Sequence, residues 1–204
     1  METKSVGPRK TMAAAARRRV EAAEPGSFLR RKDFEGTDRA VETALSRLVA
    51  AGDLMRVRRG LYWKGRPTRF GMTSPSTLEA ALAVAGPGAG PTGVAAALLL
   101  GLTTQVPGVI EVAVPGKAPE PYPGVRFRTR PYGRREHHMS PTEVAALEVL
   151  RDPRSAEASW ADVGGVVRGL VASHAIRAEA FSEVVCAEHH PAARERWSSL
   201  VGAS

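Results

Sequence analysis

The sequence predicts an α+β protein of two domains, and three observations lead to this prediction. A helical pattern of apolar residues at 37–52 is followed at once by two short β-prone runs, at 54–58 and 61–64. Positive charge is concentrated in the first third of the chain. The remainder mixes several helix patterns with few strand patterns, so we expect a mixed α/β domain with a small sheet and a helical C-terminal tail.

The helix at residues 37–52 has clear ends and two distinct faces. Thr37 suits the N-cap because its hydroxyl can accept a hydrogen bond from a free amide of the first turn, and Gly52 suits the stop because glycine readily adopts positive φ. Its apolar face repeats every three or four residues and comprises Val41, Ala44, Leu45, Leu48 and Val49. Its polar face comprises Arg39, Glu42, Thr43, Ser46 and Arg47.

The two β-prone runs after this helix are predicted to form a hairpin whose two-residue turn is at 59–60. In the register that this turn implies, Val57 faces Tyr62 and Arg56 faces Trp63. An amphipathic helix followed directly by a hairpin is typical of the recognition helix and wing of a winged helix-turn-helix.

Arg58 and Arg59 at the hairpin tip favour this interpretation, because a purely structural turn has no use for two adjacent arginines. Upstream, residues 11–24 are rich in alanine and predict a first helix, and residues 27–34 are expected to form a short second helix before a turn at 35–36. We therefore predict a winged helix-turn-helix domain over residues 1–70 and an α+β domain over residues 71–204.

The distribution of charge points to a polyanionic partner for the first domain. Residues 1–70 contain 17 Lys and Arg against 8 Asp and Glu, a net charge of +9. Residues 71–204 contain 12 against 13, a net charge of −1. Double-stranded DNA is the natural partner for such a basic segment, since binding releases counterions from its phosphates.

The second domain is predicted from caps and periodicity. Residues 65–73 are expected to be a linker, and Ser140 with Glu143 forms a capping box at the start of one helix. The other expected helices cover 77–85, 94–100, 158–172, 178–187 and 191–201, and the expected strands cover 109–114 and 125–129.

The sequence gives little support for a dinucleotide-binding enzyme, a metal site, a membrane span or a secretory signal. The glycines at 88–93 match a dinucleotide-binding pattern, but a helix pattern precedes them where a strand is required, so we expect a flexible connection between helices. Cys186 is the only cysteine, and the histidines lack the spacing of a metal site. The longest apolar run, residues 94–102, is too short to cross a bilayer, and no secretory signal is expected. We expect a cytoplasmic protein.

Two segments taken together resemble a known family. They are LSRLVAAGDLMRVRRGLYWKG at residues 45–65 and GLTTQVP at residues 101–107, in this order. They resemble the AbiEi family of antitoxins from bacterial type IV toxin–antitoxin systems. The likeness runs from residue 28 to residue 130 and is densest in RVRRGLY and GLTTQVP, and EVAALEVLRDP at 143–153 has the general look of the family's helical C-terminus.

The resemblance implies a winged helix that binds operator DNA and represses its own two-gene operon, and a second domain that counteracts a nucleotidyltransferase-like toxin. Whether the toxin is bound directly, and whether the protein self-associates on DNA, both stay open. No catalytic residue, cofactor or metal is expected. The expected DNA-binding residues lie in the recognition helix, around its start and in the wing. They are Lys32, Thr37, Arg39, Thr43, Ser46, Arg47, Arg58 and Arg59.

Two alternatives from other classes remain. One is a nucleic-acid-modifying enzyme whose basic N-terminus delivers the second domain to its substrate, and clustered Asp, Glu and His in residues 71–204 would favour it. The other is a ligand-responsive winged-helix repressor, and a closed apolar pocket in the second domain would favour that.

Overall fold

The computed structural model describes residues 12–202, and the chain divides into two units, Met1–Ser76 and Thr77–Ser204. Each unit combines helices with a three-stranded sheet and contains its own hydrophobic core, so the α+β class holds for both. The boundary predicted after residue 70 lies inside the first unit, because residues 71 and 72 form a strand that pairs with residues 67 and 68. Residue 11, where the first helix was predicted to begin, lies outside the described residues.

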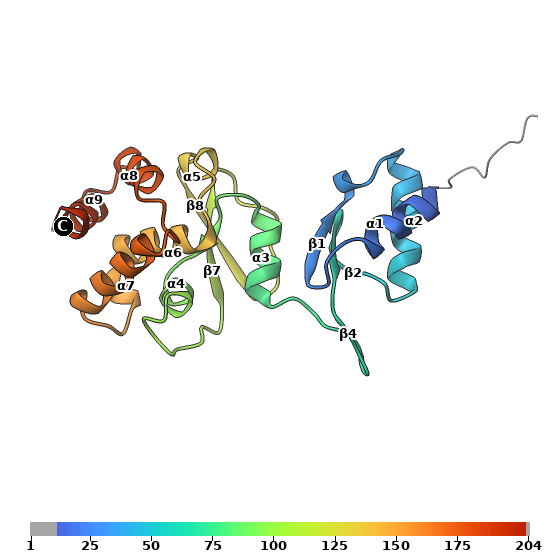
Figure 1. Ribbon diagram of the computed structural model, residues 1–204, viewed down its shortest axis with the longest axis horizontal. Helices are drawn as coiled ribbons and strands as arrows, with labels where there is room; N and C mark the ends of the chain where they lie inside the picture. The colour runs from blue at the N-terminus through green and yellow to red at the C-terminus, as the bar shows by residue number, and fades with distance from the viewer. Residues whose placement is uncertain (1–11, 203–204) are drawn as a thin grey trace, which may run out of the picture. The chain divides into compact units, whose positions relative to one another are not determined.

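The first unit packs two helices against a sheet of order β1-β3-β2 (Figure 1). Its elements are α1 (Met12–Glu21), β1 (Ser27–Arg30), the 3-10 turn η1 (Arg31–Asp33), α2 (Asp38–Ala50), β2 (Met55–Arg58) and β3 (Leu61–Lys64). The predicted apolar face of α2 is confirmed, since Val41 and Leu45 are fully buried. They share a core with Val20 of α1 and Tyr62 of β3.

The short helix predicted at residues 27–34 is wrong for most of its length. Residues 27–30 form the strand β1, which pairs antiparallel with β3 from Ser27 opposite Lys64 to Arg30 opposite Leu61. Pairing decides the conformation of so short a segment: Leu29 is buried, and the ring of Phe28 packs on Trp63 with centroids 4.8 Å apart. Only η1 is helical.

The hairpin of β2 and β3 has the predicted turn but not the predicted register. Arg58 faces Leu61, so residues 59 and 60 form the turn, and Gly60 has φ +74°. Further along, Arg56 faces Tyr62 and Met55 faces Trp63. The register shifts at Val57, which is an extra residue in β2, a β-bulge. Arg56 therefore does not face Trp63, and Val57 has no partner across the strands.

Residues 65–73, predicted as a linker, form an anchored second hairpin. Strands β4 (Pro67–Thr68) and β5 (Gly71–Met72) pair antiparallel. The Trp63 indole Nε1 donates to the Thr73 carbonyl oxygen at 2.6 Å, and the Arg66 amide donates to Thr73 Oγ1 at 2.9 Å. The first bond ties the end of the hairpin to the strand β3, and the second joins the two ends of the hairpin to each other.

The second unit is built around one buried helix, α6. Its sheet has the order β6-β7-β8, with β6 (Gly90–Pro91) antiparallel and β8 (Val125–Arg130) parallel to the central strand β7 (Ile110–Pro115). The helices are α3 (Thr77–Ala85), α4 (Val94–Leu99), α5 (Gly133–Glu136), α6 (Pro141–Arg151), the 3-10 turn η2 (Pro153–Ser155), α7 (Trp160–Ala172), α8 (Ala178–Ala187) and α9 (Pro191–Val201). Every residue from 143 to 150 of α6 is buried.

The core of this unit is divided by the sheet. Helix α3 packs on one face through Ala81 and Ala85, which share a cluster with Val112 and Val114. The other face carries Ala113 and packs towards α4 and α6, and α7, α8 and α9 cover the far side of α6 (Figure 1). The predicted capping box of α6 is confirmed: Ser140 Oγ accepts from the Glu143 amide, and the Glu143 carboxylate accepts from the Ser140 amide.

The glycine-rich segment at 86–93 is not the flexible connection that was expected. It is mostly buried and supplies the strand β6. A side chain on Gly90 would overlap Val144 of α6, so glycine permits the close approach of strand and helix. Helix α3, not a strand, precedes it. Within residues 12–202, no helix combines the length and apolar character needed to cross a bilayer.

Candidate nucleic-acid interface

Helix α2 presents an exposed polar face along its full length. Arg39, Thr43, Ser46 and Arg47 are all exposed, as the helical period predicted. The helix ends as expected, with Gly52 at φ +79° and the Asp53 amide donating to the Leu48 carbonyl oxygen at 2.9 Å. The face is therefore fixed by the core beneath it and open to a partner above.

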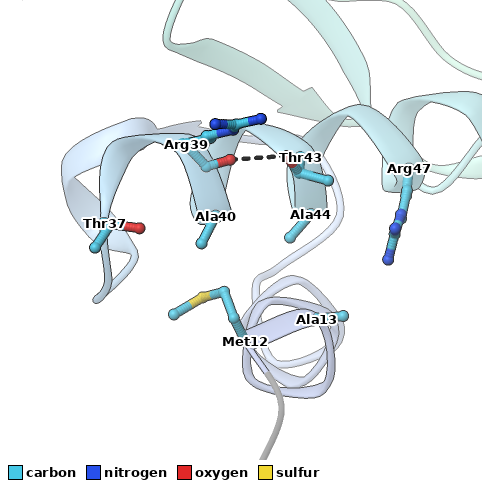
Figure 2. Close-up of a pocket in the computed structure, with 8 residues that line it drawn as sticks. All are labelled: Met12, Ala13, Thr37, Arg39, Ala40, Thr43, Ala44 and Arg47. Carbon is cyan, nitrogen blue, oxygen red and sulfur yellow. Dashed lines mark hydrogen bonds between the residues drawn. The ribbon is translucent and has the colours of Figure 1, made fainter.

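One side of this face is hollowed where α1 and α2 run past each other. The groove has a volume of about 470 Å³ and is lined by Met12, Ala13, Thr37, Arg39, Ala40, Thr43, Ala44 and Arg47. Figure 2 shows that Ala40 and Ala44 form its α2 wall opposite Met12. In the same view Arg47 reaches down towards the side of α1, whereas the Arg39 guanidinium turns away from Met12.

The two arginines of this face are not neutralised. Arg39 and Arg47 make no ion pair or side-chain hydrogen bond with another described residue. Thr43 is different, since its hydroxyl donates to the Arg39 carbonyl oxygen at 2.8 Å. Its only proton is used inside the helix, so towards a partner Thr43 offers an accepting oxygen and a methyl group.

The other side of α2 meets the hairpin of β2 and β3. A shallow groove of about 290 Å³ there is lined by Glu42, Ser46, Arg56, Arg59 and Tyr62. Arg59 Nε lies 3.8 Å from Glu42 Oε1, and both side chains are largely exposed, so the pair is worth well under about 1 kcal/mol. Arg56 was not among the predicted binding residues. The register shift at Val57 places it here, beside Ser46.

The turn before α2 is held by Arg31 and not by the predicted cap. Thr37 occupies the N-cap position, but its side chain accepts no hydrogen bond from the helix. Instead, Arg31 forms an ion pair with Asp38 and donates to the carbonyl oxygens of Phe34, at 3.2 Å, and Gly36, at 2.9 Å. Arg31 is thus a structural residue, whereas its neighbour Lys32 is exposed.

Lys64, at the end of β3, is also structural. Its Nζ donates to the carbonyl oxygens of Val20, Glu21 and Ala23 at 2.7, 3.0 and 2.6 Å. A positive charge is favourable at the C-terminus of a helix, where the last carbonyl groups lack partners. Lys64 therefore caps α1 and fixes it to the sheet.

The buried carboxylates of the second unit, those of Glu143, Glu148 and Glu188, are engaged by arginines. Arg134, fully buried, forms a two-pronged contact with Glu188, and its Nη1 lies 2.7 Å from Glu148 Oε1. Arg130 binds Glu148 through Nε at 2.7 Å and Nη2 at 2.5 Å, and Arg151 Nη1 donates to Glu188 at 2.7 Å. We name Arg130, Arg134, Arg151, Glu148 and Glu188 the buried ion network.

Burial alone would raise the pKa of Glu148, but hydrogen bonds from Arg130 and the charges of Arg134 and Arg130 lower it to about 2. The same balance acts at Glu143: burial opposes ionisation, and hydrogen bonds from Arg177 prevail and lower its pKa. These carboxylates are committed to the fold. Within residues 12–202, no group of three or more His, Cys, Asp or Glu side chains is arranged to hold a metal ion.

The structure thus gathers most of the predicted residues into one region of the first unit, around α2, whereas for Lys32 it shows only exposure. Arg39, Thr43 and Arg47 lie along one groove, Ser46 and Arg59 line the other, and Arg58 ends β2 beside them. The guanidinium groups of Arg39 and Arg47, which make no ion pair with another described residue, suit phosphate oxygens and the acceptor edges of bases, and helix-borne hydroxyl groups suit either.

The chain is similar in sequence to one protein family and in structure to one solved protein. Comparison with curated proteins gives no match. One similar solved structure is the RV2827C protein from Mycobacterium tuberculosis, with 19% identity, a TM-score of 0.45, and coverage of 94% of this chain and 76% of that chain. A family profile matches residues 16–120, which is most of the first unit together with α3, α4 and β7. Because this match covers more than half of the 204 residues, the chain belongs to DUF6088, a family of unknown function.

Proposed function

We propose that the first unit is a winged helix-turn-helix that binds double-stranded promoter DNA. The order of its elements supports this, since α1, β1, η1, α2, β2 and β3 follow one another with η1 in the place of the second helix. In this assignment α2 is the recognition helix and the β2–β3 hairpin is the wing. The observation that carries the proposal is the exposed, unneutralised pair Arg39 and Arg47 on α2, flanked by the hairpin cations.

Position along α2 assigns a different role to each residue. Arg39 and Thr43 lie in the N-terminal half, which enters the major groove in such modules, so they are the base readers. Since the Thr43 hydroxyl can only accept a hydrogen bond from a partner, it suits the amino group of adenine or cytosine. The methyl group of Thr43 suits an apolar contact with the methyl group of thymine. Arg47 lies one turn further on and contacts phosphate, as do Lys32, Arg58 and Arg59.

The biological role that we propose follows the AbiEi resemblance. The protein represses its own operon by covering the promoter against RNA polymerase, and residues 77–204 act as an antitoxin against a nucleotidyltransferase-like toxin. No catalytic step is assigned to this unit. The engagement of Glu143, Glu148 and Glu188 by arginines supports that assignment, because a nuclease-like reaction needs carboxylates that can reach substrate or metal.

The GLTTQVP segment supplies an exposed feature on the second unit. Gly101 follows α4 with φ +70°, and the Glu157 carboxylate accepts hydrogen bonds from Thr103 Oγ1, at 2.5 Å, and Gln105 Nε2. Val106, the residue after these two hydrogen bonds, is 83% exposed. A fixed loop with an exposed apolar residue is compatible with a protein partner.

Repression and protection can be separated by experiment. Replacing Arg58 and Arg59 by Ala is expected to abolish repression of a promoter reporter while cells stay protected against toxin expressed from an independent promoter. The hairpin loses its phosphate contacts, and the second unit keeps its own core. The matched control is Arg154→Ala, an exposed arginine of the second unit that should alter neither readout.

A chain ending at Ser76 provides the reverse test. It retains the whole first unit, so it should bind DNA but should not protect. Rescue of growth by this truncated chain would remove the antitoxin role from the second unit. Full repression by the variant that lacks Arg58 and Arg59 would show that the wing does not contact DNA.

A further inference from the structure

The second hairpin of the first unit ends in a tip that turn chemistry does not explain. Thr68 faces Gly71, so Arg69 and Phe70 form a two-residue turn. Such turns favour Gly, Asn or Asp, and here Gly71, with φ +111°, provides the unusual backbone conformation just after the turn. Phe70 is nevertheless 86% exposed, the most exposed large apolar side chain of the described residues.

This tip is held firmly. Thr68 Oγ1 donates to the Gly71 carbonyl oxygen at 2.8 Å and accepts from the Phe70 amide at 3.2 Å. At the base, a side chain on Gly65 would overlap Met72 and the Thr73 carbonyl oxygen, so the two ends pack in direct contact. The tip residues are therefore presented on a fixed support, and their ordering costs little when a partner binds.

The charge of this segment selects an anionic partner. Residues 64–76 contain Lys64, Arg66 and Arg69 and no Asp or Glu. Lys64 is used to cap α1, but Arg66 makes no ion pair with another described residue. The Arg69 guanidinium lies 4.6 Å from the centroid of the Phe70 ring, so the tip offers a cation and an aromatic surface together.

The hairpin lies beside the C-terminal end of α2. A groove of about 460 Å³ separates them and is lined by Ala51, Gly52, Asp53, Lys64, Gly65, Pro67, Thr68, Gly71 and Met72. The tip of the β2–β3 hairpin lies towards the other end, where the Arg31 amide donates to the Gly60 carbonyl oxygen and Arg59 lies near Glu42. One cationic hairpin thus lies beside the C-terminal end of α2 and the other beside Glu42 and Ser46, and the 13 residues of the helix span about 20 Å.

We propose that the turn of Arg69 and Phe70 is a second DNA contact, which enters the minor groove next to the site that α2 reads. This inference rests on the proposed DNA binding. Arg69 occupies the negative potential of the minor groove, and Phe70 packs against the sugars or wedges between base pairs, as apolar residues do in minor-groove binders. Arg66, at the base, contacts the neighbouring phosphate.

The test uses the full-length protein and a duplex that the wild-type chain selects from a random-sequence pool. Hydroxyl-radical footprinting of Phe70→Ala should show protection shortened at one end only, with affinity at least about 5-fold weaker. Arg69→Ala should lose the same end of the footprint, and the slope of log affinity against log salt should fall by about 1. Phe70→Leu, which keeps an apolar wedge, should recover most of the footprint.

Val109→Ala is the matched control, because Val109 is an exposed apolar residue of the second unit, 47% exposed, and it should leave the footprint unchanged. Footprints for Phe70→Ala and Arg69→Ala that match wild type, while Arg39→Ala weakens binding, would overturn the second contact and leave the proposed function standing. Failure of the wild-type chain to select any duplex would overturn both.

Discussion

The two units use arginine in different ways. In the first unit, Arg39, Arg47 and Arg56 line the surface around α2 and make no ion pair with another described residue. In the second unit, Arg130, Arg134 and Arg151 bind Glu148 and Glu188 within the buried ion network. A count of arginines does not distinguish these uses. What distinguishes them is the availability of glutamates, because a buried guanidinium needs a carboxylate and an exposed one is free for an external anion.

Removing one arginine from the buried ion network should give the largest effect on stability. Arg134→Ala leaves two buried glutamates with incomplete partners, and we expect the free energy of unfolding of the second unit to fall by about 3–5 kcal/mol. Urea unfolding of residues 77–204 measures it. Arg154→Ala is the control, since Arg154 is exposed and pairs with Asp152 at 3.0 Å, and we expect a loss below about 1 kcal/mol. Equal losses for both variants would contradict the comparison.

Acid should destabilise the second unit through the same network. The pKa of Glu148 is about 2 in the folded protein against 4.5 for the ordinary side chain. Its stabilisation is therefore fully present above pH 4.5 and is lost as the pH falls from there through about 2. The difference corresponds to on the order of 3 kcal/mol.

Glu143, whose pKa is also lowered, acts in the same direction. The check is the urea midpoint of residues 77–204 between pH 6 and pH 2, which should decrease across the lower half of this range. A midpoint that stays constant down to about pH 2 would show that the network does not stabilise the ionised glutamates.

Single substitutions on α2 should give smaller effects, and they should differ in kind. Arg39→Ala is expected to cost about 1–3 kcal/mol at the cognate site and to relax specificity, because a base contact is lost. Arg47→Ala should weaken all sequences alike. Competition binding with cognate and random duplexes separates the two outcomes, and an unchanged cognate-to-random ratio in Arg39→Ala would show that Arg39 does not read bases.

The helices were predicted well where a long period or a cap defines them. The buried and exposed faces of α2 follow from its spacing of apolar residues, and α8 and α9 have the predicted bounds. Short strands were predicted less well, because residues 27–30 and 90–91 are strands only through pairing with β3 and β7. Strands of only four and two residues are too short to show a periodic pattern, so the sequence does not indicate which strand each one pairs with.

Part of the candidate site could be predicted from the sequence, and part of it could not. The exposure of Arg39, Thr43 and Arg47 follows from the helical period. The position of Arg56 does not, since it depends on the bulge at Val57, which no local pattern indicates. The burial of Arg134 was equally inaccessible, because its partner Glu188 lies 54 residues away in the sequence.

We propose above all that the first unit alone carries DNA binding, through the basic side chains around α2. The most direct measurement is fluorescence anisotropy of a promoter duplex with residues 1–76 and with residues 77–204, across a range of salt concentrations. We predict that residues 1–76 bind with a slope of log affinity against log salt steeper than about −3, as expected when several phosphates are neutralised. Residues 77–204 should not bind. Binding by residues 77–204, or no binding by residues 1–76 to a duplex that the full chain binds, would contradict the account.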